Sequence, residues 1–426
     1  MKILKKALPL CLLALALVIG VTLLTPKAEA AVVDGGTCGE NLLWILDEQG
    51  ILTISGTGPM TDYDTDWDSP SGSTHPWAAV AALIQTVDIK EGVTSIGAHA
   101  FYECVNLTYV TVPDSVTAIG EWAFYNCDSL VSVALPPNVS NIGGWAFYNC
   151  NSLTGIWVDT DNADYCCDAS GVLFSKDGTQ LIQAPGAISG YYQIPYGVTE
   201  IGPEAFCNCD ELRLVSFPDS LKTIGSGSFA GCNSLLSVDI PDSVTSIQIE
   251  AFCDCAQLQT VTVGSGVNSL VWYTFSGCPS LWDVKLGDGI KYITNGVFSD
   301  CSALYNITLP GGLTGIGDDV FYGCEQLGFI FFNGTMAQWE QIEIGSNNEP
   351  LKNASLVTLE ADADNGDLNE DSLTDNSDVL VLLWHTLFPV ENPIGINVDY
   401  NEDGLVDNGD VLILLWHCLF PEENPL

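Results

Sequence analysis

Basic residues are scarce in this chain of 426 residues, which carries 11 Lys and Arg against 54 Asp and Glu. A surface this acidic repels phosphate backbones and anionic lipid headgroups, so nucleic acids and membrane surfaces are disfavoured as partners. Histidine is scarce too, and two of the four, His385 and His417, occupy equivalent positions of a C-terminal duplication. The acidic composition suits hard divalent cations and would keep an extracellular protein soluble.

Sequence motifs of catalysis are missing as well. The chain contains no Gly-x-Ser-x-Gly, no His-Glu-x-x-His and no glycine-rich phosphate loop. Carboxylate pairs are abundant, but a solvated acidic surface accounts for them in a chain with this many acids. No catalytic residue is predicted, and the sequence favours a protein that is not an enzyme.

Residues 1–30 have the organisation of a secretory signal peptide. Three lysines precede an apolar stretch over residues 7–24, and Ala-Glu-Ala at residues 28–30 has the small residues of a cleavage site. The alternative is an uncleaved anchor, because the apolar stretch approaches the length of a membrane span. We therefore expect a secreted protein.

A repeat of 23 residues organises the middle of the chain. Phenylalanine recurs in nine units, with cysteine three residues later and leucine three residues after that. The nine phenylalanines are Phe101, Phe124, Phe147, Phe206, Phe229, Phe252, Phe275, Phe298 and Phe321. The step from Phe147 to Phe206 is longer because it holds an insert, at about 159–194. Periods of about 20 to 30 residues predict a solenoid whose units bury their apolar faces against their neighbours.

Each unit is predicted to contain one strand of a parallel sheet. Val110 and Val112 alternate with Tyr109 and Thr111, which is the period of a strand. The Ile-Gly pair before each Ala-Phe is expected to turn the chain into a short helical bend. The residues predicted on the exposed face of the sheet are Tyr109, Thr111, Ser132, Ala134, Trp157, Ser216, Asp239, Thr260, Thr262, Asn306, Thr308, Phe329 and Phe331.

The pattern Ile-Gly-x-x-Ala-Phe-x-x-Cys-x-x-Leu-x-x-Val-x-Leu-Pro resembles the BspA-type leucine-rich repeat family of secreted bacterial proteins. The resemblance implies a binding or adhesion role without a particular ligand. Residues 31–95 are predicted to cap the solenoid, residues 96–333 to form it, and residues 334–361 to form a second cap and a linker. Two units depart from the pattern, with Ile247-Gln248 and Leu270-Val271 in place of Ile-Gly.

The cysteines of the repeats are predicted to stack in one column. Neighbours in this column would lie about 5 Å apart, which is compatible with disulfides by Cα distance. Cysteine is also a small buried hydrophobe, and this packing role is the preferred interpretation. Cys207-Asn-Cys209 and Cys253-Asp-Cys255 lack the paired spacing of a metal site.

A duplication with an offset of 32 residues follows the repeats. Residues 367–378 align with residues 399–410, with oxygen-bearing side chains at loop positions 1, 3, 5, 9 and 12 and a leucine carbonyl at position 7. This is the ligand arrangement of an EF-hand, so two Ca²⁺ ions are predicted. The predicted metal ligands are Asp367, Asn369, Asp371, Leu373, Asp375 and Asp378 in the first loop and Asp399, Asn401, Asp403, Leu405, Asp407 and Asp410 in the second.

Each loop leads into an apolar helical segment, over residues 379–388 and 411–420. Residues 362–426 resemble a dockerin, a small all-α calcium-binding domain with two EF-hand-like loops. The resemblance implies attachment to a cohesin module of a scaffold protein, as in a cellulosome. The partner-binding positions that it implies are Asn376, Ser377, Leu383, Trp384 and Phe388 in the first copy and Asn408, Gly409, Leu415, Trp416 and Phe420 in the second.

The sequence therefore predicts a repeat solenoid with parallel β-strands and short helical turns, joined to a dockerin. The expected function is that of a secreted binding protein whose repeats hold an extracellular protein or carbohydrate. Two alternatives stay open: an enzyme component of a cellulosome-like complex that acts on polysaccharide or protein, and a structural spacer.

Overall fold

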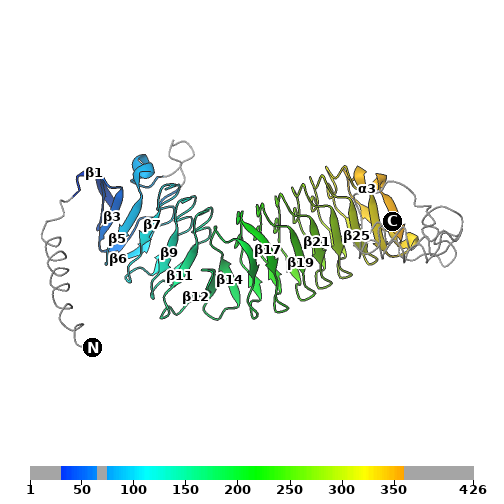
Figure 1. Ribbon diagram of the computed structural model, residues 1–426, viewed down its shortest axis with the longest axis horizontal. Coiled ribbons are helices and arrows are strands. Elements are labelled where there is room, and N and C mark those ends of the chain that lie inside the picture. Colours follow the sequence, from blue (N-terminus) through cyan, green and yellow to red (C-terminus); the bar gives the residue numbers. More distant parts are fainter. Residues whose placement is uncertain (1–29, 65–73, 359–426) are drawn as a thin grey trace, which may run out of the picture.

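The computed structural model describes residues 30–64 and 74–358. In this part of the chain successive turns stack into one elongated, curved array (Figure 1). One strand of each turn joins a long sheet, which is split into two by the insert. Its strands pair in parallel except at the N-terminal end, where the first three strands pair antiparallel. Its first part contains β1 (Val32–Gly39), β2 (Leu42–Asp47), β3 (Ile51–Gly56), β5 (Thr86–Ile89), β7 (Tyr109–Thr111), β9 (Ser132–Leu135) and β11 (Gly155–Val158). Its second part contains β15 (Gly190–Gln193), β17 (Leu212–Ser216), β19 (Ser237–Ile240), β21 (Thr260–Val263), β23 (Asp283–Leu286), β25 (Asn306–Pro310), β27 (Phe329–Asn333) and β29 (Ser355–Thr358).

The register of the long sheet follows the sequence period. Ser237 pairs with Thr260, and Thr260 pairs with Asp283, so equivalent residues 23 positions apart are hydrogen-bonded neighbours. Val238, Val261 and Val284 are buried, while the residues between them face outward. The parallel sheet with an inward valine column is therefore confirmed.

The Ile-Gly pair marks the end of a second short strand in each repeat. These strands form three further sheets, interrupted at the insert and between β20 and β22, where the sequence departs from Ile-Gly. The first of these sheets contains β4 (Gly58–Pro59), β6 (Val93–Ile96), β8 (Ala118–Ile119) and β10 (Asn141–Ile142). The second contains β12 (Tyr165–Cys167), β13 (Leu173–Ser175), β14 (Gln180–Gln183), β16 (Glu200–Ile201), β18 (Thr223–Ile224) and β20 (Ser246–Ile247). The third contains β22 (Ser269–Leu270), β24 (Tyr292–Ile293), β26 (Gly315–Ile316) and β28 (Glu343–Ile344).

The short helical bend predicted after Ile-Gly is wrong for the repeats, because the chain forms a run of turns there instead. The residues two before and two after each phenylalanine adopt left-handed conformations, with φ from 54° to 76°. A left-handed residue at every fourth position stops a right-handed helix from growing. The N–H groups therefore alternate: that of Tyr102 donates to the His99 carbonyl within the turn, and that of Phe101 donates to the Ala123 carbonyl of the next repeat.

The phenylalanines form the centre of the core as two ladders of stacked rings. Ring centroids of neighbours lie 4.8 to 5.9 Å apart, in one ladder from Phe101 to Phe147 and in another from Phe206 to Phe321. Aromatic rings at such distances stabilise one another beyond the area that they bury. Each repeat is thus bound mainly to its two neighbours.

Single side chains complete the hydrogen bonding at both ends of the stack. At the N-terminal end, Trp77 stacks on Phe101 at 5.4 Å, and its indole N–H donates to the Ala100 carbonyl at 2.9 Å. At the C-terminal end, the buried Asn348 side chain accepts the N–H of Phe321 at 3.0 Å. In the other repeats, except that of Phe147, which precedes the insert, that N–H is bound by the backbone of the next unit. The helices near these ends are η1 (Ala78–Leu83), α2 (Met336–Trp339) and α3 (Glu349–Asn353).

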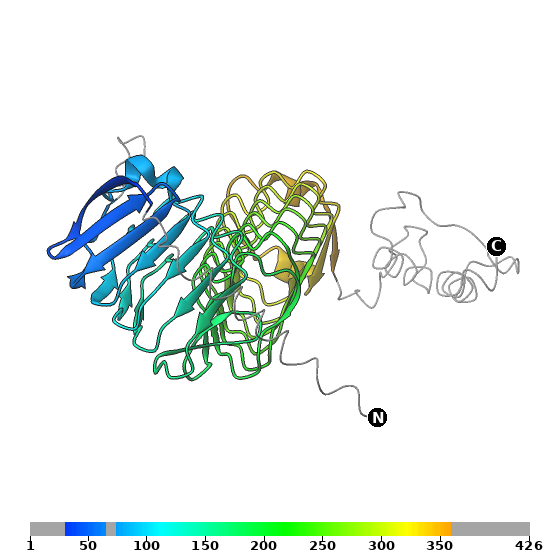
Figure 2. The same ribbon diagram turned by 60° about the vertical axis from the view of Figure 1, so that its left-hand side comes forward.

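The insert adds an antiparallel unit of β12, β13 and β14 between the third and fourth repeats. β14 then pairs in parallel with β16, which restarts the array. The N-terminal and C-terminal halves meet at an angle near this point (Figure 2). One edge of the molecule is consequently hollowed at the middle of its length (Figure 1).

Candidate binding surfaces

The outward face of the long sheet is accessible to solvent and mostly uncharged. Tyr109 and Trp157 are 50% and 42% exposed, and Thr111, Ala134 and Thr262 are exposed beside them along the sheet. An open face of this kind, made of small polar and aromatic side chains, suits contact with a neutral partner. Asn306 lies on this face in register with Asp283 but is not exposed as predicted: it is 4% exposed, and its side chain hydrogen-bonds to Asp283.

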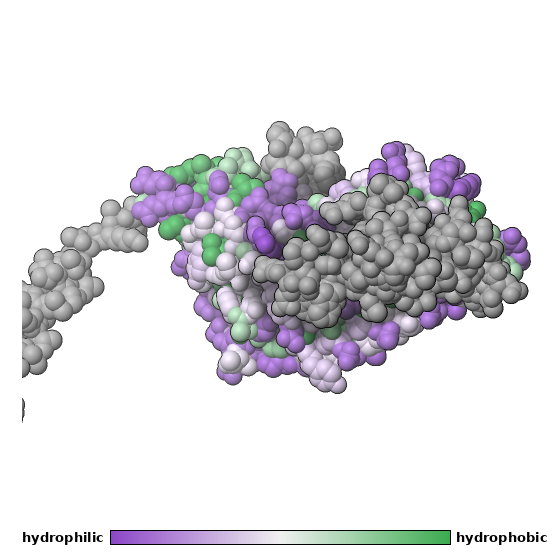
Figure 3. All heavy atoms as spheres, turned by 45° about the vertical axis from the view of Figure 1, so that its right-hand side comes forward, coloured by the Kyte–Doolittle hydropathy of each residue, from purple (hydrophilic) through white to green (hydrophobic). Residues whose placement is uncertain are grey.

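The surface near the N-terminal end is more hydrophobic than the rest (Figure 3). Leu43 and Ile45 project from β2 and are 56% and 46% exposed. Gly35 and Thr37 of β1 pair with them and leave them uncovered. This hydrophobic end lies in the predicted N-terminal cap, whereas hydrophilic residues predominate along the visible rims of the repeats.

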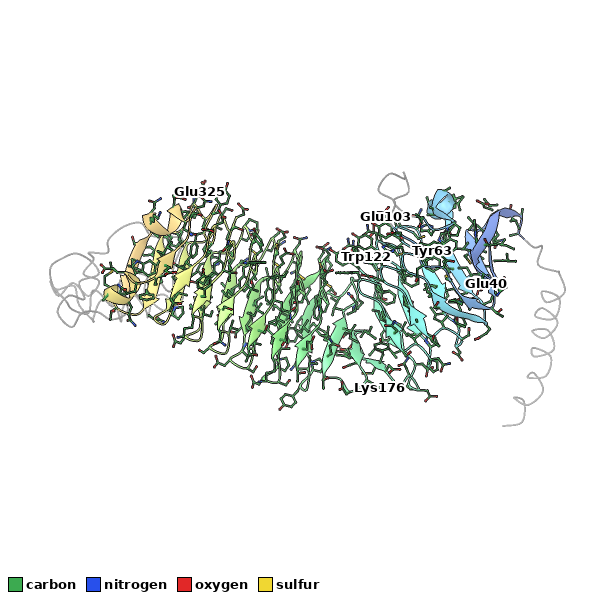
Figure 4. All side chains as sticks on the ribbon, turned by 180° about the vertical axis from the view of Figure 1, so that it is seen from behind. Glu40, Tyr63, Glu103, Trp122, Lys176 and Glu325 are labelled. Atoms are coloured by element: carbon green, nitrogen blue, oxygen red, sulfur yellow. The ribbon has the colours of Figure 1, made fainter. Side chains whose placement is uncertain are left out.

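A double row of aromatic rings lies along the turns of the first three repeats, and the sequence interpretation did not identify it. His99, Trp122 and Trp145 form one row, with centroids 5.8 and 5.0 Å apart. A second row consists of Tyr102, Tyr125 and Tyr148, with rings 4.9 and 5.2 Å apart. Trp122 lies on the hollowed edge with Glu103 and Glu325, whereas Lys176 lies on the opposite edge (Figure 4). The signal was present as aromatic residues recurring at an interval of 23.

The three residues of the first aromatic row have a backbone conformation that glycine would adopt more easily. His99, Trp122 and Trp145 have φ between 54° and 59°. Such values destabilise a non-glycine residue by roughly 1 kcal/mol. The six equivalent positions of later repeats include Gly227, Gly296, Glu250 and Asp319, so the turn itself does not require an aromatic side chain.

A cavity of about 430 Å³ opens between the third and fourth repeats. Phe147 and Leu173 contribute apolar atoms to its lining, Trp145 and Tyr165 contribute aromatic rings, and Gln180 contributes a polar side chain. Trp145 is 38% exposed, so the cavity is reached from the surface that carries the aromatic row. This volume lies in the range of small-molecule sites, roughly 300 to 1,000 Å³.

The stacked cysteines are free thiols that donate hydrogen bonds. All fourteen cysteines in the described residues are free. The thiol of Cys127 donates to the Phe101 carbonyl of the preceding repeat at 3.2 Å, and six later repeats repeat this contact at 3.1 to 3.3 Å. Burial raises the pKa of Cys104 and Cys150 to about 12, so these thiols stay protonated at neutral pH.

The predicted metal-binding and partner-binding residues, from Asp367 to Phe420, lie outside the described residues, as does most of the predicted signal peptide. Within residues 30–64 and 74–358, no group of three or more His, Cys, Asp or Glu is placed to hold a metal ion. In the Cys-x-Cys motif at 207–209, Cys209 is in the core and the Cys207 thiol donates to the Tyr148 hydroxyl at 3.5 Å. No helix of the described part has the length and hydrophobicity needed to cross a bilayer.

Solved structures with a similar architecture come from several bacteria. A leucine-rich repeat protein from Eubacterium ventriosum is 27% identical, with a TM-score of 0.56, and the match covers 75% of this chain and 94% of that one. A leucine rich cell surface protein from Faecalibacterium prausnitzii is 24% identical over 75% of this chain and 99% of that one, with a TM-score of 0.48. The pneumococcal vaccine antigen PcpA is 18% identical over 74% and 98%, with a TM-score of 0.45. No protein of curated function matches the chain.

One family model matches the repeats on both sides of the insert. The model for the BspA type leucine-rich repeat region matches in six copies, over residues 81–167, 190–248 and 224–343. These ranges contain the phenylalanine ladders, the thiol column and most of both kinds of sheet. The chain therefore belongs to the BspA-type leucine-rich repeat family.

Proposed function

We propose that this protein is a secreted bacterial binding protein whose repeats hold an extracellular ligand on the outward face of the long sheet. The observation that carries the proposal is this face itself, where Tyr109 and Trp157 are half exposed and no helix of the described residues covers the strands. Exposed aromatic residues are the side chains that contribute most to binding at interfaces. Membership of a leucine-rich repeat family supports the same role.

Substitution on the sheet face tests this proposal. The double variant Tyr109→Ala and Trp157→Ala is expected to lose binding to those members of a protein and glycan array that the mature chain recognises. Tyr196→Ala is the matched control, because Tyr196 is 86% exposed but lies outside the strands. Equal binding by the wild type and the double variant would contradict a role for the face. A chain that binds nothing on the array would favour a spacer.

Attachment to a scaffold is proposed for residues 362–426, through a calcium-dependent dockerin. Its support is the duplicated loop, in which the predicted ligands repeat at an offset of 32 residues. Calcium prefers six to eight oxygen ligands on a flexible loop, which the carboxylates and amides of each copy would supply. Binding would also relieve the mutual repulsion of these carboxylates.

Calorimetric titration of the mature chain with calcium tests this second part. Two binding events are expected, with a gain of helix measured by circular dichroism. Asp371→Ala and Asp403→Ala are each expected to remove one event, and a surface substitution such as Tyr196→Ala none. Calcium-dependent capture of a purified cohesin module would support the attachment role, whereas the absence of heat and of helix gain would rule out the dockerin.

A further inference from the structure

The cavity between the third and fourth repeats lies where the insert replaces the Phe-x-x-Cys turn with a shorter segment. Leu181 pairs with Ile201 as the short strand of a preceding repeat would, and Tyr191 pairs with Leu214 as its long strand would. The chain takes ten positions from Leu181 to Tyr191, against thirteen between the equivalent residues of a regular repeat, Ile224 and Ser237. No Phe-x-x-Cys segment therefore fills this level of the stack.

The phenylalanine ladder of the core is interrupted at the same place. Phe147 ends the first phenylalanine ladder, and Phe206, which begins the second, contacts Tyr192 instead of another ladder phenylalanine at this side. In regular steps the carbonyl of the strand-ending isoleucine accepts an N–H from the next repeat, but no backbone N–H of the described residues reaches the carbonyl of Ile142 in this way. Ile142 is among the residues that line the cavity, so the gap offers apolar surface.

The two sides of the gap are held together at the molecular surface. The Trp145 indole hydrogen-bonds to Glu204 across it. The Asn208 amide donates to the Tyr148 hydroxyl at 3.3 Å, which joins the same two repeats. These contacts fix the position of Trp145 at the mouth of the cavity, so the site exists before any ligand arrives.

The polar groups of the cavity are mainly hydrogen-bond acceptors. The Gln180 side-chain amide donates to Glu200 at 3.1 Å, and that of Gln183 donates to the Ala184 carbonyl at 3.1 Å. Their carboxamide oxygens have no partner within the described part of the chain and are available to a ligand. A ligand that fits must present several hydroxyl or amine donors.

The negative charge of the chain disfavours anionic ligands in the cavity. The chain has a net charge of −43, and Lys176, from the insert, lies on the edge opposite to the aromatic row. Acceptor oxygens without a nearby cation repel phosphate, sulfate and carboxylate groups. A neutral hexose presents hydroxyl donors around a ring whose C–H face can pack on an aromatic side chain, so it satisfies both the acceptors and Trp145.

We propose that this cavity binds one neutral hexose residue, stacked on Trp145 and hydrogen-bonded to the carboxamide oxygens of Gln180 and Gln183. An aromatic side chain of a peptide would fill the apolar part but would leave most of the acceptors unpaired, which destabilises a complex. The site is separate from the sheet face, so it extends the proposed function and does not depend on it.

Binding of simple sugars to the mature chain tests the proposal. The probes are the methyl glycosides of glucose, galactose and mannose, with glucuronic acid as an anionic control and indole as an aromatic one, followed by saturation-transfer NMR and calorimetry. At least one neutral glycoside is expected to bind, with glucuronic acid at least about tenfold weaker. Binding of indole but of no glycoside would overturn the sugar assignment, and binding of none of the probes would overturn the site.

Two variants locate the binding within the cavity. Trp145→Ala is expected to weaken the neutral glycoside about tenfold, because it removes the stacking surface. Gly144→Phe is expected to abolish binding by filling the mouth; a Cβ added to Gly144 meets no atom within 4 Å, so a side chain can begin there without a clash.

Trp272→Ala is the matched control, because Trp272 is an exposed tryptophan (58%) that lies outside the strands and does not line the cavity. Its glycoside affinity is expected to equal that of the wild type, and circular dichroism with the midpoint of thermal unfolding checks the fold of each variant. Sugar binding that Trp145→Ala and Gly144→Phe leave unchanged would place the sugar elsewhere.

Discussion

At the scale of single residues, the cysteine of seven of the nine repeats is explained by one hydrogen bond to the preceding repeat. Cys232 is completely buried, and its thiol donates to the Phe206 carbonyl at 3.1 Å. An alanine there would leave that carbonyl without its thiol partner, whereas a thiol supplies a weak donor and fills more volume. The recurrence of cysteine predicted burial and packing correctly. The bond to the preceding repeat could not be predicted, because it depends on the left-handed turn that aims the carbonyl inward.

A residue-scale prediction concerns pH and His75. This histidine is 3% exposed, lies 3.2 Å from the Tyr102 carbonyl and stacks on Trp77. Burial lowers its pKa from 6.5 to about 4. Between these two values the unfolded chain binds a proton that the folded chain does not, so the stabilising contribution is complete above pH 6.5 and falls as the pH drops towards 4.

The measurement is the free energy of unfolding by denaturant at pH 7.5 and at pH 4.5. Between these conditions the wild type is expected to lose about 2 kcal/mol more than His75→Gln, because a lowered pKa is worth about 1.4 kcal/mol per unit. Loss of packing in the variant lowers both values equally and cancels in the difference. His99→Gln, at a half-buried histidine, is the control; a wild type and His75→Gln with the same pH dependence would contradict the role of burial.

At the scale of elements, the strands were predictable and the turns were not. Alternation around Val110 predicted the strand, and a period of 2 leaves little choice about which side chains face inward. The turn after Ile-Gly has apolar residues at Ala and Phe positions that also fit a helix. Its conformation is decided by bonds to the neighbouring repeat, as between Phe101 and Ala123, and a single repeat in the sequence does not contain that information.

An element-scale prediction concerns the last turn and Asn348. Its side-chain oxygen accepts the N–H of Phe321, and its amide donates to the carbonyls of Gly317, Gly345 and Ser346. Asn348→Ala leaves these groups without partners in a buried position, so a loss of about 2 to 3 kcal/mol in unfolding free energy is expected. Amide hydrogen exchange at Phe321 is expected to accelerate.

The control for Asn348 is Ser346→Ala, at an exposed residue whose hydroxyl bonds to Asp318. A change below about 0.5 kcal/mol is expected there, as for most surface substitutions. If Asn348→Ala changed the unfolding free energy no more than the control and the Phe321 amide stayed protected from exchange, water would be replacing the Asn348 hydrogen bonds. Asn348 would then contribute little to the stability of the last turn.

At the scale of the whole molecule, the 23-residue period determines the array and the insert determines its bend. Every regular step adds one strand to the long sheet and one ring to a ladder, and both follow from counting residues. The insert over about 159–194 was recognised in the sequence, but its length is not a multiple of the period. The angle between the halves, and the cavity that goes with it, depend on how β12 to β14 pack, which spacing does not reveal.

A whole-molecule prediction is that one complete repeat can be removed without unfolding the rest. Removing residues 239–261, which is one period, joins Val238 to Thr262 and restores the sequence of a strand. Because each repeat contacts mainly its neighbours, the shortened chain is expected to fold, with Phe229 stacked on Phe275 and a maximum dimension reduced by about 4.8 Å. Its unfolding should remain cooperative, with a slightly smaller dependence on denaturant because less surface is buried.

Removing residues 239–260 is the matched control. It joins Val238 to Val261 and shifts the following strand by one residue, which would turn its buried side chains outward. That variant is expected to lose cooperative unfolding and to be cleaved quickly by protease near the junction. If both deletions folded equally well, neighbouring repeats would not be held in register by their strands, and the stacked phenylalanines alone would have to maintain the array.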